Sequence, residues 1–268
     1  MMQLVNRALA TCKFELRQSF STQRLAVASV LILFPPVMLT LMISVTRMGG
    51  SASFDAVEVV IIFLISLICI LSLLLWATPN VYSELEGKSW MFIASRPQGR
   101  ISTVLGKFLS SLIFSFCICC ASITLCVCAS TLLLNFVFDP VRLWLGLNGV
   151  FLLGCICYAA VFSLIGTIFY RRAMVIGAGY ILGFETIVGR IPAVIGKLTA
   201  SYHLQYIGLE WTGSEQLKQQ IQQAKFLGAF EEHSVWMHLL AVAIITILAL
   251  AAACFVIVNR EYVTSDEN

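Results

Sequence analysis

Six long apolar blocks dominate this sequence and restrict what it can fold into. An α-helix needs about 20 consecutive apolar residues to cross the hydrocarbon core of a bilayer. Inside that core the backbone must satisfy its own hydrogen bonds, so blocks of this length are expected to be helices. The blocks fall at residues 25–45, 59–77, 108–134, 143–170, 173–188 and 235–258. We therefore expect an all-α integral membrane protein with six transmembrane helices, folded as a single domain over residues 1–268.

Composition supports this class and excludes others. Hydrophobic residues make up 59% of the chain and charged residues only 12%, whereas a soluble domain carries about 25% charged residues. The net charge is +3 and the basic residues are dispersed, so no nucleic-acid surface is expected. Nine of the ten cysteines fall in apolar blocks and Cys12 lies in the N-terminal segment. We interpret them as small buried hydrophobic residues rather than as a disulfide framework.

The distribution of Lys and Arg predicts the orientation. If the N-terminus lies inside, most basic residues of the short connections also lie inside, as the positive-inside rule requires. Residues 79–107 then form a cytoplasmic loop and residues 189–234 an extracytoplasmic segment. Within that segment Ser214 is a candidate N-cap of a short helix. We expect a multi-pass protein of the cytoplasmic membrane with both termini cytoplasmic.

Residues 3–20 predict an amphipathic helix before the first span. Apolar residues recur there at steps of three and four, namely Val5, Leu9, Cys12, Leu16 and Phe20. Arg7, Lys13 and Arg17 lie off that stripe. Such a helix suits the inner membrane surface, in contact with lipid. The alternative is a helix packed on a soluble partner.

Motifs for chemistry are weak. Gly87-Lys88-Ser89 resembles the end of a P-loop, but that motif needs a glycine where this chain has Tyr82. We therefore expect a non-catalytic chain that binds no cofactor of its own. Five cysteines of two neighbouring spans could hold a soft metal ion: Cys117, Cys119, Cys120, Cys155 and Cys157. No accompanying His or Met pattern supports this, and we expect no metal site.

Two features of block 173–188 stand out. Gly179 and Gly183 form a G-x-x-x-G pair, which favours close helix packing within the chain or across a dimer. Glu185 is a rare intramembrane carboxylate. We favour a structural role for Glu185, with Arg190 as its partner, over a role in proton transfer.

The predicted cytoplasmic loop carries three linked sequence pieces. They are Ser83-Glu84-Leu85-Glu86-Gly87-Lys88-Ser89, Ser95-Arg96-Pro97-Gln98-Gly99-Arg100 and Leu105-Gly106-Lys107-Phe108-Leu109. This arrangement resembles the ABC-2 type ABC transporter permeases, whose loop between spans two and three reads E-x-E-x-G-T, then a proline with a basic residue, then L-G-K-F. Ser89 stands where that family has threonine, after a lysine insertion. An N-terminal elbow helix, six spans and an outer segment before the last span are also similar, so the resemblance covers nearly the whole chain.

The resemblance implies a membrane permease subunit that forms a homo- or heterodimer and docks separate ABC ATPase subunits, which bind ATP and Mg. A coupling helix in the loop would make this contact, with Glu84, Glu86, Gly87, Trp90, Arg96, Pro97 and Arg100 as its candidate residues. Trp90, Met91 and Phe92 offer apolar anchors, and the charged residues offer ion pairs. The alternative for these residues is an ordinary connecting loop with interfacial aromatic side chains.

The function implied by the resemblance is ATP-driven export of a substrate. Two alternatives remain open. One is a mechanical ABC membrane subunit that acts on an extracytoplasmic partner without transport. The other is an ion-coupled secondary transporter. Two observations argue against it: the spans contain almost no ionisable residues, and the sequence shows no inverted repeat.

Overall fold

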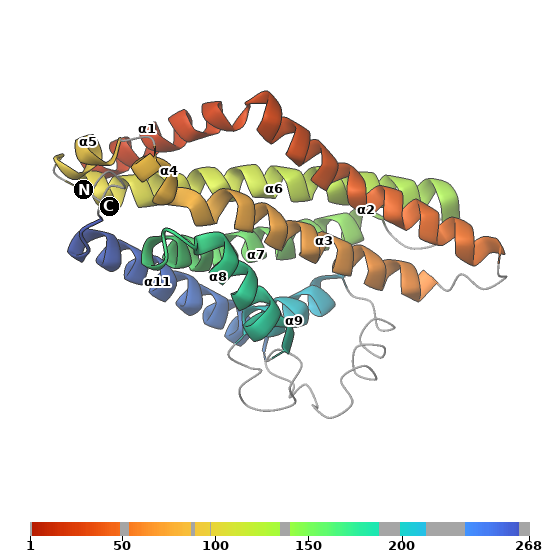
Figure 1. Cartoon of the computed structure of the whole chain (residues 1–268). Helices are drawn as coiled ribbons and strands as arrows, with labels where there is room; N and C mark the ends of the chain where they lie inside the picture. Colours follow the sequence, from red (N-terminus) through yellow and green to blue (C-terminus); the bar gives the residue numbers. More distant parts are fainter. Residues whose placement is uncertain are drawn as a thin grey trace.

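A computed structural model shows an all-helical protein (Figure 1). The structure describes residues 2–48, 54–86, 89–96, 98–134, 140–187, 199–212 and 234–262, and none of these residues forms a strand. The predicted helix beginning at Ser214 lies outside the described residues, as do Gly87, Pro97 and Arg190.

The described helices follow the order of the predicted blocks. They are α1 (Met2–Ser19), α2 (Thr22–Met48), α3 (Phe54–Ala77), the 3-10 helix η1 (Thr78–Asn80), α4 (Tyr82–Glu86), α5 (Trp90–Ala94), α6 (Gly99–Leu134), α7 (Pro140–Ile168), α8 (Ala173–Tyr180), the π-helix η2 (Ile181–Ile187), α9 (Ala200–Thr212) and α11 (Val235–Asn259).

Within the described residues, five helical segments are long and apolar enough to cross a membrane. They are Thr22–Val45, Ile61–Glu86, Gly99–Leu133, Pro140–Ile168 and Val235–Asn259. The chain is therefore a multi-pass α-helical membrane protein. At the predicted fifth span, 173–188, the structure has only the shorter apolar helix Ala173–Glu185. At 1.5 Å per residue such a helix is about 20 Å long, which is less than the hydrocarbon thickness of about 30 Å.

Helix α6 begins earlier than predicted. From sequence, Arg100 and Lys107 are predicted to lie in the cytoplasmic loop 79–107, before the apolar block at 108–134. In the structure both residues belong to α6, which starts at Gly99. Each has protein partners: Arg100 donates a hydrogen bond to a backbone carbonyl, and Lys107 forms ion pairs. Within its described residues, the predicted 79–107 loop thus contains the end of η1, the short helices α4 and α5, and the first turns of α6.

Helix α7 is the centre of the bundle. In its most apolar stretch of 18 residues, 72% is buried inside the protein, whereas the corresponding share is 22–50% in the other candidate spans. It packs against α3, α6, α9 and α11. By contrast, α2 and α11 expose large apolar side chains, including Val30, Ile247 and Phe255. An apolar outer surface of this kind matches lipid rather than water as the surrounding medium.

Helix α1 lies along α6 (Figure 1). Its predicted apolar stripe divides between two environments: Cys12 is buried, whereas Val5, Leu9 and Phe20 are exposed. The contact with α6 uses small residues such as Ala8 and Thr11, because the two helices lie close together. The bulky apolar residues of α1 are left on its outer side.

Candidate functional site

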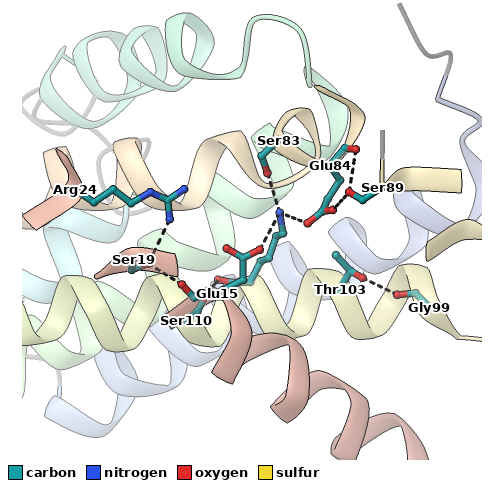
Figure 2. Close-up of polar contacts among 10 residues, drawn as sticks. Glu15, Ser19, Arg24, Ser83, Glu84, Ser89, Gly99, Thr103 and Ser110 are labelled. Atoms are coloured by element: carbon teal, nitrogen blue, oxygen red, sulfur yellow. Dashed lines mark hydrogen bonds and ion pairs between the residues drawn. The ribbon is translucent and has the colours of Figure 1, made fainter. Parts of the chain in front are cut away.

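A buried lysine connects three helices at the end of the bundle that carries α4 and α5. Lys107 on α6 is only 4% exposed. Its Nζ lies 3.3 Å from Glu15 Oε1 on α1 and 2.6 Å from Glu84 Oε1 on α4, and it donates a hydrogen bond of 2.8 Å to Ser83 Oγ. Figure 2 shows Glu15 of α1 converging with Ser83 and Glu84 of α4. We call Lys107, Glu15, Ser83 and Glu84 the Lys107 cluster.

Glu84 also fixes the beginning of α5. The Ser89 hydroxyl donates hydrogen bonds to the Glu84 carboxylate and, at 3.2 Å, to the Glu84 backbone carbonyl. The Ser89 amide donates to the same carbonyl at 3.1 Å. Because one carboxylate oxygen faces Lys107 and the other faces Ser89, Glu84 is directed into the protein. Glu84 therefore holds α4 and α5 against α6. A contact between Glu84 and an ATPase subunit stays a prediction.

Gly106 explains how Glu15 can reach Lys107. A Cβ atom on Gly106 would lie 2.6 Å from Thr11 Cβ and 2.8 Å from the Ala8 carbonyl oxygen of α1. Only glycine therefore allows α1 to cross α6 this closely. The close crossing brings Glu15, two turns further along α1 from Ala8, beside Lys107. In the Leu-Gly-Lys-Phe piece, Gly106 thus permits the close crossing of α1 and α6, and Lys107 supplies the buried cation.

Replacing Gly106 with Ala is expected to lower the free energy of unfolding by about 1–3 kcal/mol, the usual cost of overpacking. Alanine is the better helix former by about 1 kcal/mol, so a loss would identify the steric contact with α1 as its cause. Chemical or thermal unfolding in detergent measures the change. Gly208→Ala is the matched control, because a Cβ there meets only ordinary contacts at 3.8 Å from Val150. Equal effects of the two changes would contradict this interpretation.

An aromatic cluster attaches α5 to the other side of the bundle. Trp90 is 4% exposed and its ring packs edge-on against Tyr262, with centroids 5.1 Å apart. Tyr262 also contacts Tyr170 at 5.3 Å and donates a 2.8 Å hydrogen bond to the Thr167 carbonyl. Burial raises the pKa of Tyr262 to about 12, against the lowering effect of Arg260 and Arg100. The hydroxyl therefore keeps the proton that it donates throughout the neutral pH range.

Two arginines complete this aromatic cluster. Arg100 donates a 3.0 Å hydrogen bond to the Val258 carbonyl, and its guanidinium lies 5.9 Å from the Trp90 ring. Arg260 donates to the Ile168 carbonyl and lies over Tyr170 and Tyr262. Carbonyls at helix C-termini attract cations, and Val258 and Ile168 end α11 and α7. The cluster thus joins α5 and α6 to the ends of two spans.

The exposed side of α4 and α5 differs from the predicted one. Trp90 was expected to be an external apolar anchor, but it is an internal residue. Met91 and Phe92 are instead 70% and 72% exposed. Glu86 and Arg96 are exposed as well. These four residues, Glu86, Met91, Phe92 and Arg96, form what we call the α5 surface.

A cavity of about 230 Å³ lies beside the Lys107 cluster. Glu15, Arg24 and Lys107 line it together with serine hydroxyls and the apolar side chains of Leu75 and Trp76. Arg24 donates a 3.4 Å hydrogen bond to Ser19, and Figure 2 shows both side chains near Glu15. The residues that line it come from α1, α2, α3, η1, α4 and α6.

Glu185 lies at a second polar site, away from α5. It is buried, and its carboxylate accepts hydrogen bonds from the Tyr180 hydroxyl at 2.8 Å, the Tyr158 hydroxyl at 3.2 Å and the Ser201 amide at 3.2 Å. Ser201 is in the first turn of α9, where free amides and the helix dipole favour an acceptor. Glu185 therefore joins η2 to α7 and α9.

The two predicted packing glycines make no close contact within the described chain. A Cβ on Gly179 or on Gly183 would meet nothing within 4 Å, whereas a Cβ on neighbouring Gly177 would lie 2.7 Å from Leu74. Close packing of α8 against α3 therefore uses Gly177. Contact of Gly179 and Gly183 with a second protomer remains a prediction.

Several members of the site are not evident from sequence as site residues. Lys107, Gly106 and Ser83 belong to the three linked sequence pieces but have no predicted role, and no pattern indicates Glu15 or Tyr262. One signal in the sequence points to such a site: Lys107 directly precedes the long apolar block 108–134. A lysine buried there needs a carboxylate as its partner. Nothing in the sequence indicates which carboxylate that is.

Comparison with known proteins gives no assignment. No protein-family model matches the chain, and no curated protein matches it.

Proposed function

We propose that this chain is the membrane permease subunit of an ABC-2 type exporter, and that the α5 surface docks a separate ATPase subunit. The proposal starts from the three sequence pieces that resemble that family. It is supported by one structural observation: the short helix α5 presents exposed apolar side chains between the exposed charged residues Glu86 and Arg96, and its other side is tied to the bundle. ATP and Mg would be bound by the partner.

The α5 surface has the composition of a docking site. Met91 and Phe92 are adjacent large apolar residues with most of their area exposed, and Glu86 and Arg96 flank them with opposite charges. Aromatic residues, methionine and arginine are enriched where proteins bind one another. The complementary site is an apolar groove with a basic residue facing Glu86 and an acidic residue facing Arg96.

The contacts behind α5 supply a mechanical connection to the spans. Glu84 and Ser89 join α4 and α5 to Lys107, and hence to α1 and α6. Trp90 and Arg100 join α5 and α6 to residues at the end of α11. Rigid elements in contact transmit displacement as body movements. ATP-driven movement of a partner against the α5 surface would thus reach α1, α6 and α11 together.

The test is recovery of the partner from native membranes. We expect affinity purification of the full chain in mild detergent to recover a P-loop ATPase at about one copy per permease chain. Replacing both Met91 and Phe92 with Ser is expected to reduce that recovery at least tenfold, because removing two central apolar contacts costs about 1.4 kcal/mol or more of binding energy. Quantitative mass spectrometry of the eluate measures the ratio.

Phe14→Ser is the matched control, since Phe14 is an exposed aromatic residue on α1 outside the α5 surface. It is expected to leave recovery of the ATPase unchanged. Failure of the unaltered chain to recover any ATPase under several extraction conditions would contradict the proposal. So would equal losses for the two variants at equal folded yield.

A further inference from the structure

Three cysteines from three different helices meet in the core of the bundle. Cys69 comes from α3, Cys119 from α6 and Cys155 from α7. Their sulfur atoms all lie within 4.8 Å of one another, and the Sγ atoms of Cys69 and Cys155 are 3.6 Å apart. All three side chains are 2% exposed or less. We call Cys69, Cys119 and Cys155 the thiol cluster.

We propose that the thiol cluster is a trigonal binding site for a soft monovalent metal ion of the Cu(I) class. The spacing of the sulfur atoms carries the argument. With metal–sulfur bonds of about 2.3 Å, three sulfurs in a plane around one ion lie about 4.0 Å apart. The observed separations are close to this value, so an ion can be bound without moving a helix.

Ligand number and ligand type select the class of ion. The group contains three thiols and no histidine or carboxylate among the described residues. Zn²⁺ in structural sites takes four ligands in a tetrahedron, and hard ions prefer oxygen. Thiolate ligands are soft and select Cu(I) among the available metals. A site of three sulfur ligands therefore fits Cu(I), and also Ag(I), which is a redox-inert probe of the same charge.

Binding of the ion is coupled to the loss of protons. Cysteine binds metal ions as the thiolate, so each S–Cu bond that forms replaces one S–H bond, and the proton leaves to solvent. Three S–Cu bonds therefore release three protons, and no atom changes its oxidation state.

Sequence spacing alone did not indicate this site. The cysteines first considered as a soft-metal group share two predicted spans, whereas the structure brings in Cys69 from a third. Of the cysteines close to Cys119 and Cys155 in sequence, Cys117, Cys120 and Cys157 are not part of the group. A bound ion would hold α3, α6 and α7 together, because each helix supplies one ligand.

The experiment uses the full chain in detergent, loaded anaerobically with Ag(I) or with Cu(I) and then washed with glutathione to remove weakly bound ions. We expect one ion per chain by elemental mass spectrometry and a higher unfolding temperature in its presence. Cys119→Ser is expected to lower retention at least tenfold. Cys126→Ser is the matched control, since Cys126 is buried on the same helix but lies outside the thiol cluster, and it is expected to retain the ion.

X-ray absorption at the copper edge tests the unaltered chain, so the result does not depend on how a variant folds. Three sulfur ligands with no nitrogen or oxygen ligand are expected. Two sulfurs, or mixed ligands, would overturn the trigonal site. No ion retained by the unaltered chain after the wash, or equal retention by folded Cys119→Ser and Cys126→Ser, would show that the thiols only fill space.

Discussion

Replacing Lys107 with Met is expected to lower the free energy of unfolding by about 3–5 kcal/mol, because removing one member of a buried ion pair leaves the opposite charge uncompensated. Here two carboxylates, Glu15 and Glu84, lose the same cation, and their side chains are only 13% and 16% exposed. Methionine keeps the length and apolar stem of lysine, so the lost charge is the main change. Thermal or chemical unfolding in detergent measures the effect.

The matched rescue removes the carboxylates as well. Adding Glu15→Gln and Glu84→Gln to Lys107→Met is expected to restore much of the stability, since replacing a whole buried ion cluster with neutral groups is often close to neutral. Arg96→Met serves as the control because Arg96 is an exposed cation in the same region, and its loss is expected to change stability by less than about 1 kcal/mol. If Lys107→Met lowered the free energy of unfolding no more than Arg96→Met, the Lys107 cluster would not be a structural centre.

Glu185→Ala is expected to destabilise the protein by about 3 kcal/mol or more, whereas Glu185→Gln is expected to cost far less. The alanine variant leaves two tyrosine hydroxyls and the Ser201 amide without their acceptor, and each buried unsatisfied group costs about 1–3 kcal/mol. In the glutamine variant, the amide oxygen can accept from Tyr158 and Ser201. The amide NH₂ can then donate to the Tyr180 hydroxyl, which accepts as well as donates.

Tyr180→Phe removes only one of these hydrogen bonds and is the intermediate case, with an expected loss of about 1 kcal/mol. The same variants separate two functions. If Glu185 is a structural acceptor, Glu185→Gln keeps transport. In an ion-coupled transporter that variant would lose transport while remaining folded, because the charge itself binds the coupling ion. Folded but inactive Glu185→Gln protein would therefore favour the ion-coupled alternative over the proposed ABC permease.

Span positions follow from sequence where a block is long and continuously apolar. The blocks at 25–45, 143–170 and 235–258 match α2, α7 and α11 closely, because their length alone requires a membrane-spanning helix. Block 173–188 has similar composition but contains three glycines and Glu185. There the chain forms a short α-helix and a π-helix. The Glu185 carboxylate accepts hydrogen bonds from the Tyr158 hydroxyl on α7 and the Ser201 amide on α9. Hydropathy does not encode such contacts.

Burial of individual loop residues could not be predicted from sequence. Trp90, Met91 and Phe92 are consecutive large apolar residues, and local pattern does not distinguish them. Trp90 is internal because Tyr262, at the far end of the chain, and Arg100 lie on its side of α5. Met91 and Phe92 face away from these partners. Contacts between segments so distant in sequence depend on how the spans pack.

The amino-acid sequence by itself determined that this chain is a helical membrane protein, because the cost of exposing backbone groups to hydrocarbon leaves long apolar blocks no other structure. It also determined that residues 83–109, between two apolar blocks, are rich in glycine, charged and aromatic residues. Only the tertiary structure decided that Lys107 pairs with Glu15 and Glu84, and that Cys69 meets Cys119 and Cys155. Those pairings depend on helix crossings such as that of α1 over Gly106, which are set by close packing between segments far apart in the chain.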